Sequence, residues 1–116
     1  MEKIHINRCP KLTELLDENI DIFNKLVENN EEVPDLRNKN LSGLDLSNAM
    51  LKGLDLSGSY LRNANLRGVD LTGCNLQGAS IRNARINGTL FPEDLSAEEI
   101  IMSVTYGTRM RTFPKK

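Results

Sequence analysis

Few residues of this chain could take part in catalysis. A catalytic site needs a nucleophile with a base, a pair of carboxylates in a cleft, or a cluster of metal ligands. The sequence has one histidine, His5, and two cysteines, Cys9 and Cys74. His5 lies in the stretch IHIN without a second ligand at metal-binding spacing, and neither cysteine lies in a motif that would activate a thiol. We therefore expect no enzymatic activity, no metal and no cofactor, with His5 a structural or surface residue and both thiols inert.

The composition indicates one small domain without a membrane segment. The chain has 116 residues, enough for a single modest core, and 15 basic and 16 acidic side chains give a net charge of −1. No apolar run is long enough to cross a bilayer, and none opens the chain as a signal peptide. We expect a cytoplasmic protein of bacterial type, with no membrane partner. Leucine must build its core, because the sequence contains only two Tyr, three Phe and no Trp.

A five-residue repeat governs the middle of the chain. An aliphatic residue recurs at every fifth position from Leu36 to Ile86, and the residue two places later is always glycine or asparagine. Both residue types tolerate positive φ at low cost, so each unit contains a turn. The glycines therefore serve turn geometry, and no GK[ST] motif marks a phosphate-binding loop. The turn positions are Asn38, Gly43, Asn48, Gly53, Gly58, Asn63, Gly68, Gly73, Gly78, Asn83 and Gly88.

Four such units would complete a coil if each turns the chain through about a right angle. Stacked coils would then pair by backbone hydrogen bonds, with a spacing of about 4.8 Å between coils. The aliphatic residue of each unit points inward. The residue two places before it usually does so as well, and this second column is small or apolar apart from Lys39. We place Lys39 at the open end of the first coil, where its ammonium group can reach water. Cys74 belongs to this column and should act as a small hydrophobic side chain.

Units such as LDLSG (54–58), ANLRG (64–68), VDLTG (69–73) and CNLQG (74–78) resemble the motif of the pentapeptide-repeat family, over residues 34 to 88. The resemblance implies an all-β core in the form of a right-handed quadrilateral β-helix of about three coils, with four repeats per coil. The stretch IFNKLVENNEEVPDL (22–36) is similar to the helical segment that often precedes the first repeat in this family. Four residues depart from the usual Asn or Asp of the second motif position: Met50, Tyr60, Ser80 and Arg85.

Both flanks are predicted to cap the solenoid, whose repeats occupy residues 34–90. Residues 1–33 are predicted to form an N-terminal helical cap with one apolar face, made of Leu12, Leu15, Leu16, Ile20, Phe23 and Val27. Residues 91–107 are predicted to form a C-terminal capping helix, with Ser96 and Glu99 at capping-box spacing and a stop at Gly107. Its apolar face would consist of Ala97, Ile100, Ile101 and Val104. Residues 108–116 form a basic tail that we expect to be partly mobile.

The outward positions carry the information about binding. Residues twenty apart should be neighbours on adjacent coils, which brings one tyrosine and four arginines to one edge of the last two coils. Tyrosine and arginine are enriched at interface hot spots, so this edge is a candidate protein-contact surface. The alternative is that these are ordinary solvated positions. The candidate partner-binding residues are Tyr60, Arg62, Arg67, Arg82 and Arg85, with Met50, Arg109 and Arg111 as secondary candidates.

We expect a non-enzymatic protein-binding module that acts as an adaptor or inhibitor of a macromolecular partner. The main alternative is a structural component of a larger assembly, and self-association as a homodimer through an end cap that exposes Met102 also stays open. DNA mimicry is the family's best-known activity, but it needs an acidic rod, whereas residues 34 to 88 hold four acids and seven bases. Direct nucleic-acid binding is a lesser alternative, because few basic side chains and one exposed aromatic ring would make a weak binding site.

Overall fold

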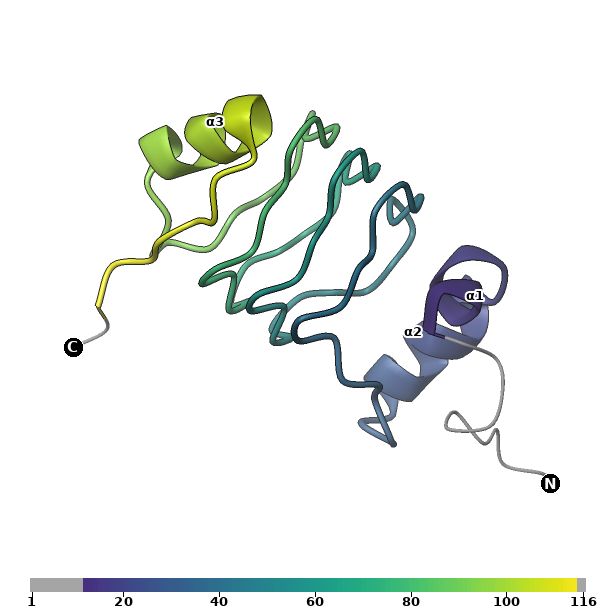
Figure 1. Cartoon of the computed structure of the whole chain (residues 1–116). Helices are drawn as coiled ribbons and strands as arrows, with labels where there is room; N and C mark the ends of the chain where they lie inside the picture. Colours follow the sequence, from purple (N-terminus) through teal and green to yellow (C-terminus); the bar gives the residue numbers. More distant parts are fainter. Residues whose placement is uncertain (1–11, 115–116) are drawn as a thin grey trace, which may run out of the picture.

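A computed structural model describes residues 12–114 of the chain (Figure 1). Helices α1 (Leu12–Asp17) and α2 (Ile20–Glu28) stand at one end of a stack of coils, and helix α3 (Ala97–Tyr106) stands at the other. None of these three helices has the length and apolarity to cross a bilayer. His5 and Cys9 lie outside the described residues, as do residues 1–11 of the predicted cap and residues 115–116 of the predicted tail.

The coils stack with a period of twenty residues. Each bridge between them is parallel and isolated, and residues 12–114 contain no continuous strand. The predicted all-β core is therefore present only as single paired residues, because the chain turns again within each five-residue unit. The bridged pairs are Asn40 with Tyr60, Tyr60 with Ser80, Asp45 with Asn65, Asn65 with Arg85, Asp55 with Asn75, and Asp70 with Leu90.

The turns follow the predicted column of glycine and asparagine. Positive φ occurs at all seven of its glycines, between 68° and 77°, and at Asn38, Asn63 and Asn83. Asn48 departs from the prediction, since its φ is not positive. Its carbonyl accepts a hydrogen bond of 2.8 Å from the side-chain amide of Asn24, which ties this turn to helix α2.

Aliphatic side chains fill the interior as predicted. The column from Leu36 to Ile81 is at most 2% exposed. The second inward column is buried from Ser59 to Ala84 and half-buried before it, whereas Lys39 is exposed as expected. Burying a leucine contributes roughly 1.5–3 kcal/mol. The repeat therefore stabilises the fold mainly through its leucines.

The second position of the motif has a structural role in the turns. Its side-chain oxygen accepts a hydrogen bond of 2.9–3.1 Å from the backbone N–H two residues later, which is an Asx turn. The four residues that depart from the motif have no carboxylate or amide to do this. Their side chains are therefore free for other contacts. The acceptors are Asp35, Asn40, Asp45, Asp55, Asn65, Asp70 and Asn75.

Helices α1 and α2 cover the first coil as predicted. Leu15, Leu16 and Phe23 are fully buried in the common core. Asn24 completes the contact, because its Nδ2 donates to the Asn48 carbonyl and its Oδ1 accepts from the Met50 N–H, both at 2.8 Å. The side-chain amide of Asn24 thus supplies backbone hydrogen bonds that a preceding coil would supply within the stack.

Helix α3 has the N-cap and the glycine stop that the sequence predicts, but it covers only Ala97–Tyr106 of the predicted range 91–107. The Ser96 hydroxyl accepts from the Glu99 N–H at 3.1 Å, and Gly107 has a left-handed φ of 75°. The predicted apolar face is wrong in part, since Ala97 is exposed and Ile101 is 63% exposed, while Ser103 is fully buried.

Hydrogen bonding explains the buried serine of α3. The amides of the last coil have no further coil to pair with, and a buried amide needs an acceptor. The Ser103 hydroxyl accepts from the Ile81 N–H at 3.0 Å, and the Val104 carbonyl accepts from the Asn83 N–H at 2.9 Å. The helix is therefore turned to cover polar backbone as well as apolar side chains.

Residues 108–114 also close the last coil. Met110 is fully buried, its N–H donates to the Ala79 carbonyl at 2.9 Å, and its carbonyl accepts from the Gly78 N–H at 2.7 Å. Arg111 forms an ion pair of 2.7 Å with Glu99. These contacts hold the described part of the predicted tail against the last coil, where it supplies an acceptor that the end of the stack requires.

Candidate functional site

We define side A of the stack by the residues that flank Leu41, Leu61 and Ile81 in the sequence. Tyr60 lies in its middle, where its N–H donates to the Lys39 carbonyl at 2.9 Å and its carbonyl accepts from the Leu41 N–H at 2.7 Å. The backbone is thus fixed by the coil ladder, and the tyrosine side chain is 41% exposed. The flanking residues of side A are Asn40, Ser42, Tyr60, Arg62, Ser80 and Arg82.

Arg109 from the C-terminal segment lies against Tyr60. Its guanidinium carbon is 4.7 Å from the centre of the tyrosine ring, a distance typical of a cation–π contact. Its Nη2 donates to the Tyr60 hydroxyl, and its Nη1 donates to the Gly78 carbonyl at 3.0 Å. The contact therefore joins Tyr60 to a segment that lies 49 residues later in the sequence.

Arg62 and Arg82 lie one above the other on side A. The Arg82 carbonyl accepts from the Asn63 N–H at 2.8 Å, which places the two arginines on adjacent coils. The stem of Arg82 lies close to Gly107, where an added Cβ would come within 3.0 Å of it. Ser80 donates to the Gly107 carbonyl at 3.0 Å. The end of α3 is thus fitted against side A.

The other predicted candidates lie elsewhere. Arg67 and Arg85 lie on the next side, which carries the stacked Asn65, and the Nε of Arg67 donates to the Asn65 Oδ1 at 3.2 Å. Met50 is exposed on a third side, beside Asn24. Arg111 is paired with Glu99. The structure therefore brings Tyr60, Arg62, Arg82 and Arg109 together, and we call these four residues the Tyr60 cluster.

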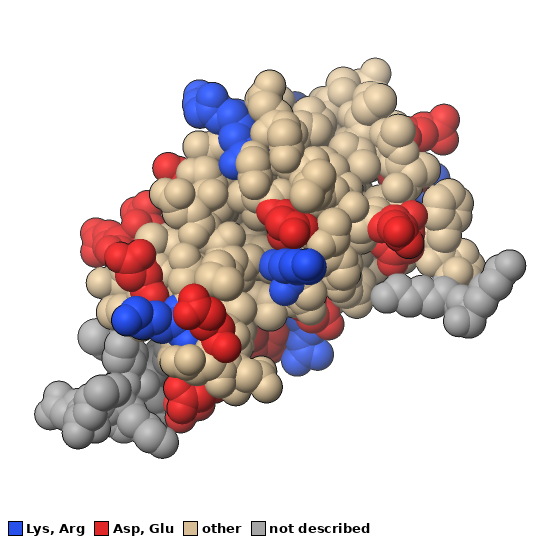
Figure 2. Space-filling model, turned by 180° about the vertical axis from the view of Figure 1, so that it is seen from behind, with Lys and Arg blue, Asp and Glu red and all other residues tan. Residues whose placement is uncertain are grey.

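Positive charge is concentrated on side A. The repeat residues there include two arginines and no acid, and Arg109 adds a third positive charge. The repeat units outside side A carry four carboxylates, from Asp35, Asp45, Asp55 and Asp70. Acidic side chains also gather at the end that carries α1 and α2, as Figure 2 shows from behind. Side A is therefore a local basic surface on a chain of net charge −1.

The ion pairs between residues 12 and 114 do not include any residue of the Tyr60 cluster. They are Arg37–Asp35 at 3.0 Å and Arg111–Glu99 at 2.7 Å. The hydrogen bonds from Arg37 lower the pKa of Asp35 to about 2, and those from Arg111 lower the pKa of Glu99. Within this range of residues, Arg62, Arg82 and Arg109 have no carboxylate partner.

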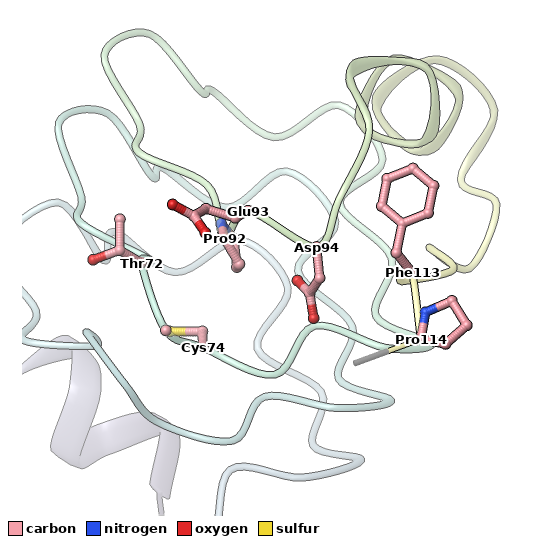
Figure 3. Close-up of a pocket in the computed structure, with 8 residues that line it drawn as sticks. Thr72, Cys74, Pro92, Glu93, Asp94, Phe113 and Pro114 are labelled. Atoms are coloured by element: carbon pink, nitrogen blue, oxygen red, sulfur yellow. The ribbon is translucent and has the colours of Figure 1, made fainter. Parts of the chain in front are cut away.

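A shallow hollow of about 580 Å³ opens elsewhere, where the chain leaves the stack at Pro92 (Figure 3). Thr72 and Cys74 line its coil side, and Asp94 and Phe113 line the opposite side. The Cys74 thiol is buried as predicted and donates to the Leu51 carbonyl at 2.9 Å. Burial raises the pKa of this thiol, which disfavours the reactive thiolate form. Residues 12–114 contain no cluster of three or more metal-binding side chains.

The comparisons with known proteins identify the repeats. The family model described as Pentapeptide repeats matches eight copies, over residues 34–63 and 55–91, which together span half of the chain. Repeats of this kind imply a β-helical solenoid in general, in agreement with the twenty-residue stacking. No curated protein and no solved structure matches the chain.

Proposed function

The chain belongs to the pentapeptide-repeat family, and on this basis we propose that it is a non-catalytic protein-binding module. It acts as an adaptor or inhibitor of a macromolecular partner, and side A is its contact surface. We further propose that the solenoid has the right-handed, four-sided form expected from the sequence, because a period of twenty residues holds four five-residue units.

The Tyr60 cluster is the observation that carries this proposal. It places an exposed aromatic ring against the Arg109 guanidinium, on a framework fixed by backbone hydrogen bonds. Tyrosine and arginine are the side chains that, with tryptophan, contribute most often to interface hot spots. A rigid backbone also reduces the entropy that binding must offset. In addition, the side chain of Tyr60 is not needed for an Asx turn, unlike those of its neighbours in the repeat.

Affinity capture from the native cell tests the proposal. The bait is the full chain, compared with the double variant Tyr60→Ala/Arg62→Ala. We expect a stoichiometric partner for the unchanged chain and its loss with the variant, at a temperature where circular dichroism shows that both baits are folded. The variant Lys52→Ala, on another side, is the control and should retain the partner. Capture that survives the change at Tyr60 and Arg62 would refute side A as the contact surface.

A second candidate is a homodimer formed through the C-terminal cap. The outward face of α3 exposes Ile101, Met102 and Tyr106, with Tyr106 70% exposed. Such an apolar face on an end cap suits a self-complementary contact with a second copy. Analytical ultracentrifugation of the chain and of Ile101→Glu tests this. A dimer that the substitution dissociates supports it, and a monomer at all concentrations rejects it.

A further inference from the structure

We propose that side A recognises a short acidic segment of a protein, whose carboxylates pair with Arg62, Arg82 and Arg109. This inference rests on the proposed binding function of the same surface and specifies the chemistry of the partner. It follows from the charge of side A, from the charge of the two ends and from the spacing of the arginines.

The charge of side A calls for an anionic partner. Between residues 12 and 114, no carboxylate forms an ion pair with Arg62, Arg82 or Arg109. The repeat residues of this side include no acid, whereas the repeat units outside side A carry four. Arginine is also suited to carboxylates, because its planar guanidinium donates two parallel hydrogen bonds to their two oxygens.

The ends of the molecule favour a short anionic segment over a long polyanion. Residues 12–33 hold seven acids and one base, and α3 carries Glu98 and Glu99 in its first turn. A nucleic acid duplex is a long rod with one negative charge per about 1.7 Å. Laid along the stack, it would meet the acidic N-terminal end. A short peptide that lies only across side A avoids this repulsion.

The spacing of the arginines matches a polypeptide. Arg62 and Arg82 lie on adjacent coils, about 4.8 Å apart along the stack. Acidic side chains two apart on an extended chain are separated by roughly 6.6 Å, and those four apart on a helix by roughly 6 Å. Flexible arginine side chains easily bridge these small differences. The two guanidiniums can therefore engage neighbouring carboxylates of one segment.

Tyr60 adds an apolar requirement. Its hydroxyl accepts from Arg109 and still has an O–H to donate, and the remainder of this 41% exposed residue is largely apolar ring. Arg109 lies over that ring and fixes it. The preferred segment therefore combines acidic residues with an aliphatic or aromatic residue that packs against Tyr60.

Fluorescence anisotropy with defined peptides tests the inference. The probe is a labelled peptide of glutamates interrupted by leucine, and the comparison peptide has glutamine at every glutamate. We expect the glutamate peptide to bind at low salt at least about tenfold more tightly than the glutamine peptide. The variant Arg62→Glu/Arg82→Glu should lose this binding. The variant Arg37→Glu/Lys52→Glu has the same change of net charge on other sides and should retain it.

Each other outcome overturns the inference. Equal binding of both peptides, or equal loss in both charge-reversal variants, would show that carboxylates on side A are not recognised. Tighter binding of a short DNA duplex than of the glutamate peptide would assign the surface to nucleic acid. If capture from the cell depends on Tyr60 and Arg62 but the glutamate peptide does not bind, the acidic-segment inference fails while the proposed function stands. If capture does not depend on them, both fail.

Discussion

The guanidinium of Arg109 lies over the ring of Tyr60, 4.7 Å from its centre, and joins the C-terminal segment to the middle of side A. The same group donates to the Gly78 carbonyl on the last coil. The candidate surface is therefore built jointly by the repeats and by the segment that closes them. A partner that binds side A would at the same time contact the end cap.

Replacing Arg109 with alanine tests this junction. The change removes a cation–π contact and hydrogen bonds to Tyr60 and Gly78, so the free energy of unfolding should fall by about 1 kcal/mol. Urea denaturation measures this loss. The control Arg109→Lys keeps the positive charge but not the planar guanidinium group, and it should restore only part of the stability. Full stability of the alanine variant would show that the contact does not form in solution.

Asn24 is predicted to hold the N-terminal cap on the first coil. Asn24→Ala removes two hydrogen bonds and leaves the Asn48 carbonyl and the Met50 amide without their partner. The expected loss in unfolding free energy is about 1–3 kcal/mol. Lys25→Ala, at an exposed neighbouring position of α2, is the control and should change stability little. Equal effects of the two substitutions would argue against a specific role for the amide.

Gly68 tests the physical basis of the turn column. Its φ is 73° and an added Cβ would meet nothing within 4 Å, so only backbone conformation opposes a side chain there. Gly68→Ala should destabilise the fold by about 1 kcal/mol. Gly68→Asn should cost less, since Asn63 and Asn83 adopt the same conformation at the turn position of other units. Thermal melting measures both effects, and a lower melting temperature for Gly68→Asn than for Gly68→Ala would contradict this explanation.

Stability is predicted to decrease as the pH falls from about 4 towards 2. The folded-state pKa of Asp35 is lowered to about 2, and that of Glu99 is also lowered, in both cases first by hydrogen bonds from an arginine side chain. A group with a depressed pKa stabilises the fold above its unfolded pKa of about 4, and this contribution is lost as it becomes protonated. Melting temperatures across this range measure the effect. The double variant Asp35→Asn/Glu99→Gln should show a weaker dependence on pH, and an unchanged dependence would contradict the assignment.

The repeats could be predicted because their determinants are local and recur every five residues. Each leucine is buried for the same reason as the one before it, and each glycine or asparagine turn is specified by its own residue. Asn48 is the exception: its φ is not positive, and its carbonyl accepts a hydrogen bond from Asn24, which lies outside the repeat. Helix α3 was predictable from its capping residues, and helices α1 and α2 were predictable from their apolar spacing.

The composition of the candidate site was harder to predict. Stacking at twenty residues identified Tyr60, Arg62 and Arg82 as neighbours, but no periodicity relates Tyr60 to Arg109, which is 49 residues away. The error on Ile101 has a related cause. Apolar spacing alone cannot show that the amides of Ile81 and Asn83 require acceptors from α3. Contacts that close the end of a solenoid depend on which backbone groups lack a next coil.

The most direct test of side A as the binding surface is hydrogen–deuterium exchange of the full chain, alone and with the partner recovered by affinity capture. Backbone amides on side A and in the segment that closes it should become protected, namely those of residues 60–63, 80–83 and 107–110. Exchange elsewhere in the repeats should change little. Protection confined to the outward face of α3 or to α1 and α2, with side A unchanged, would contradict the account.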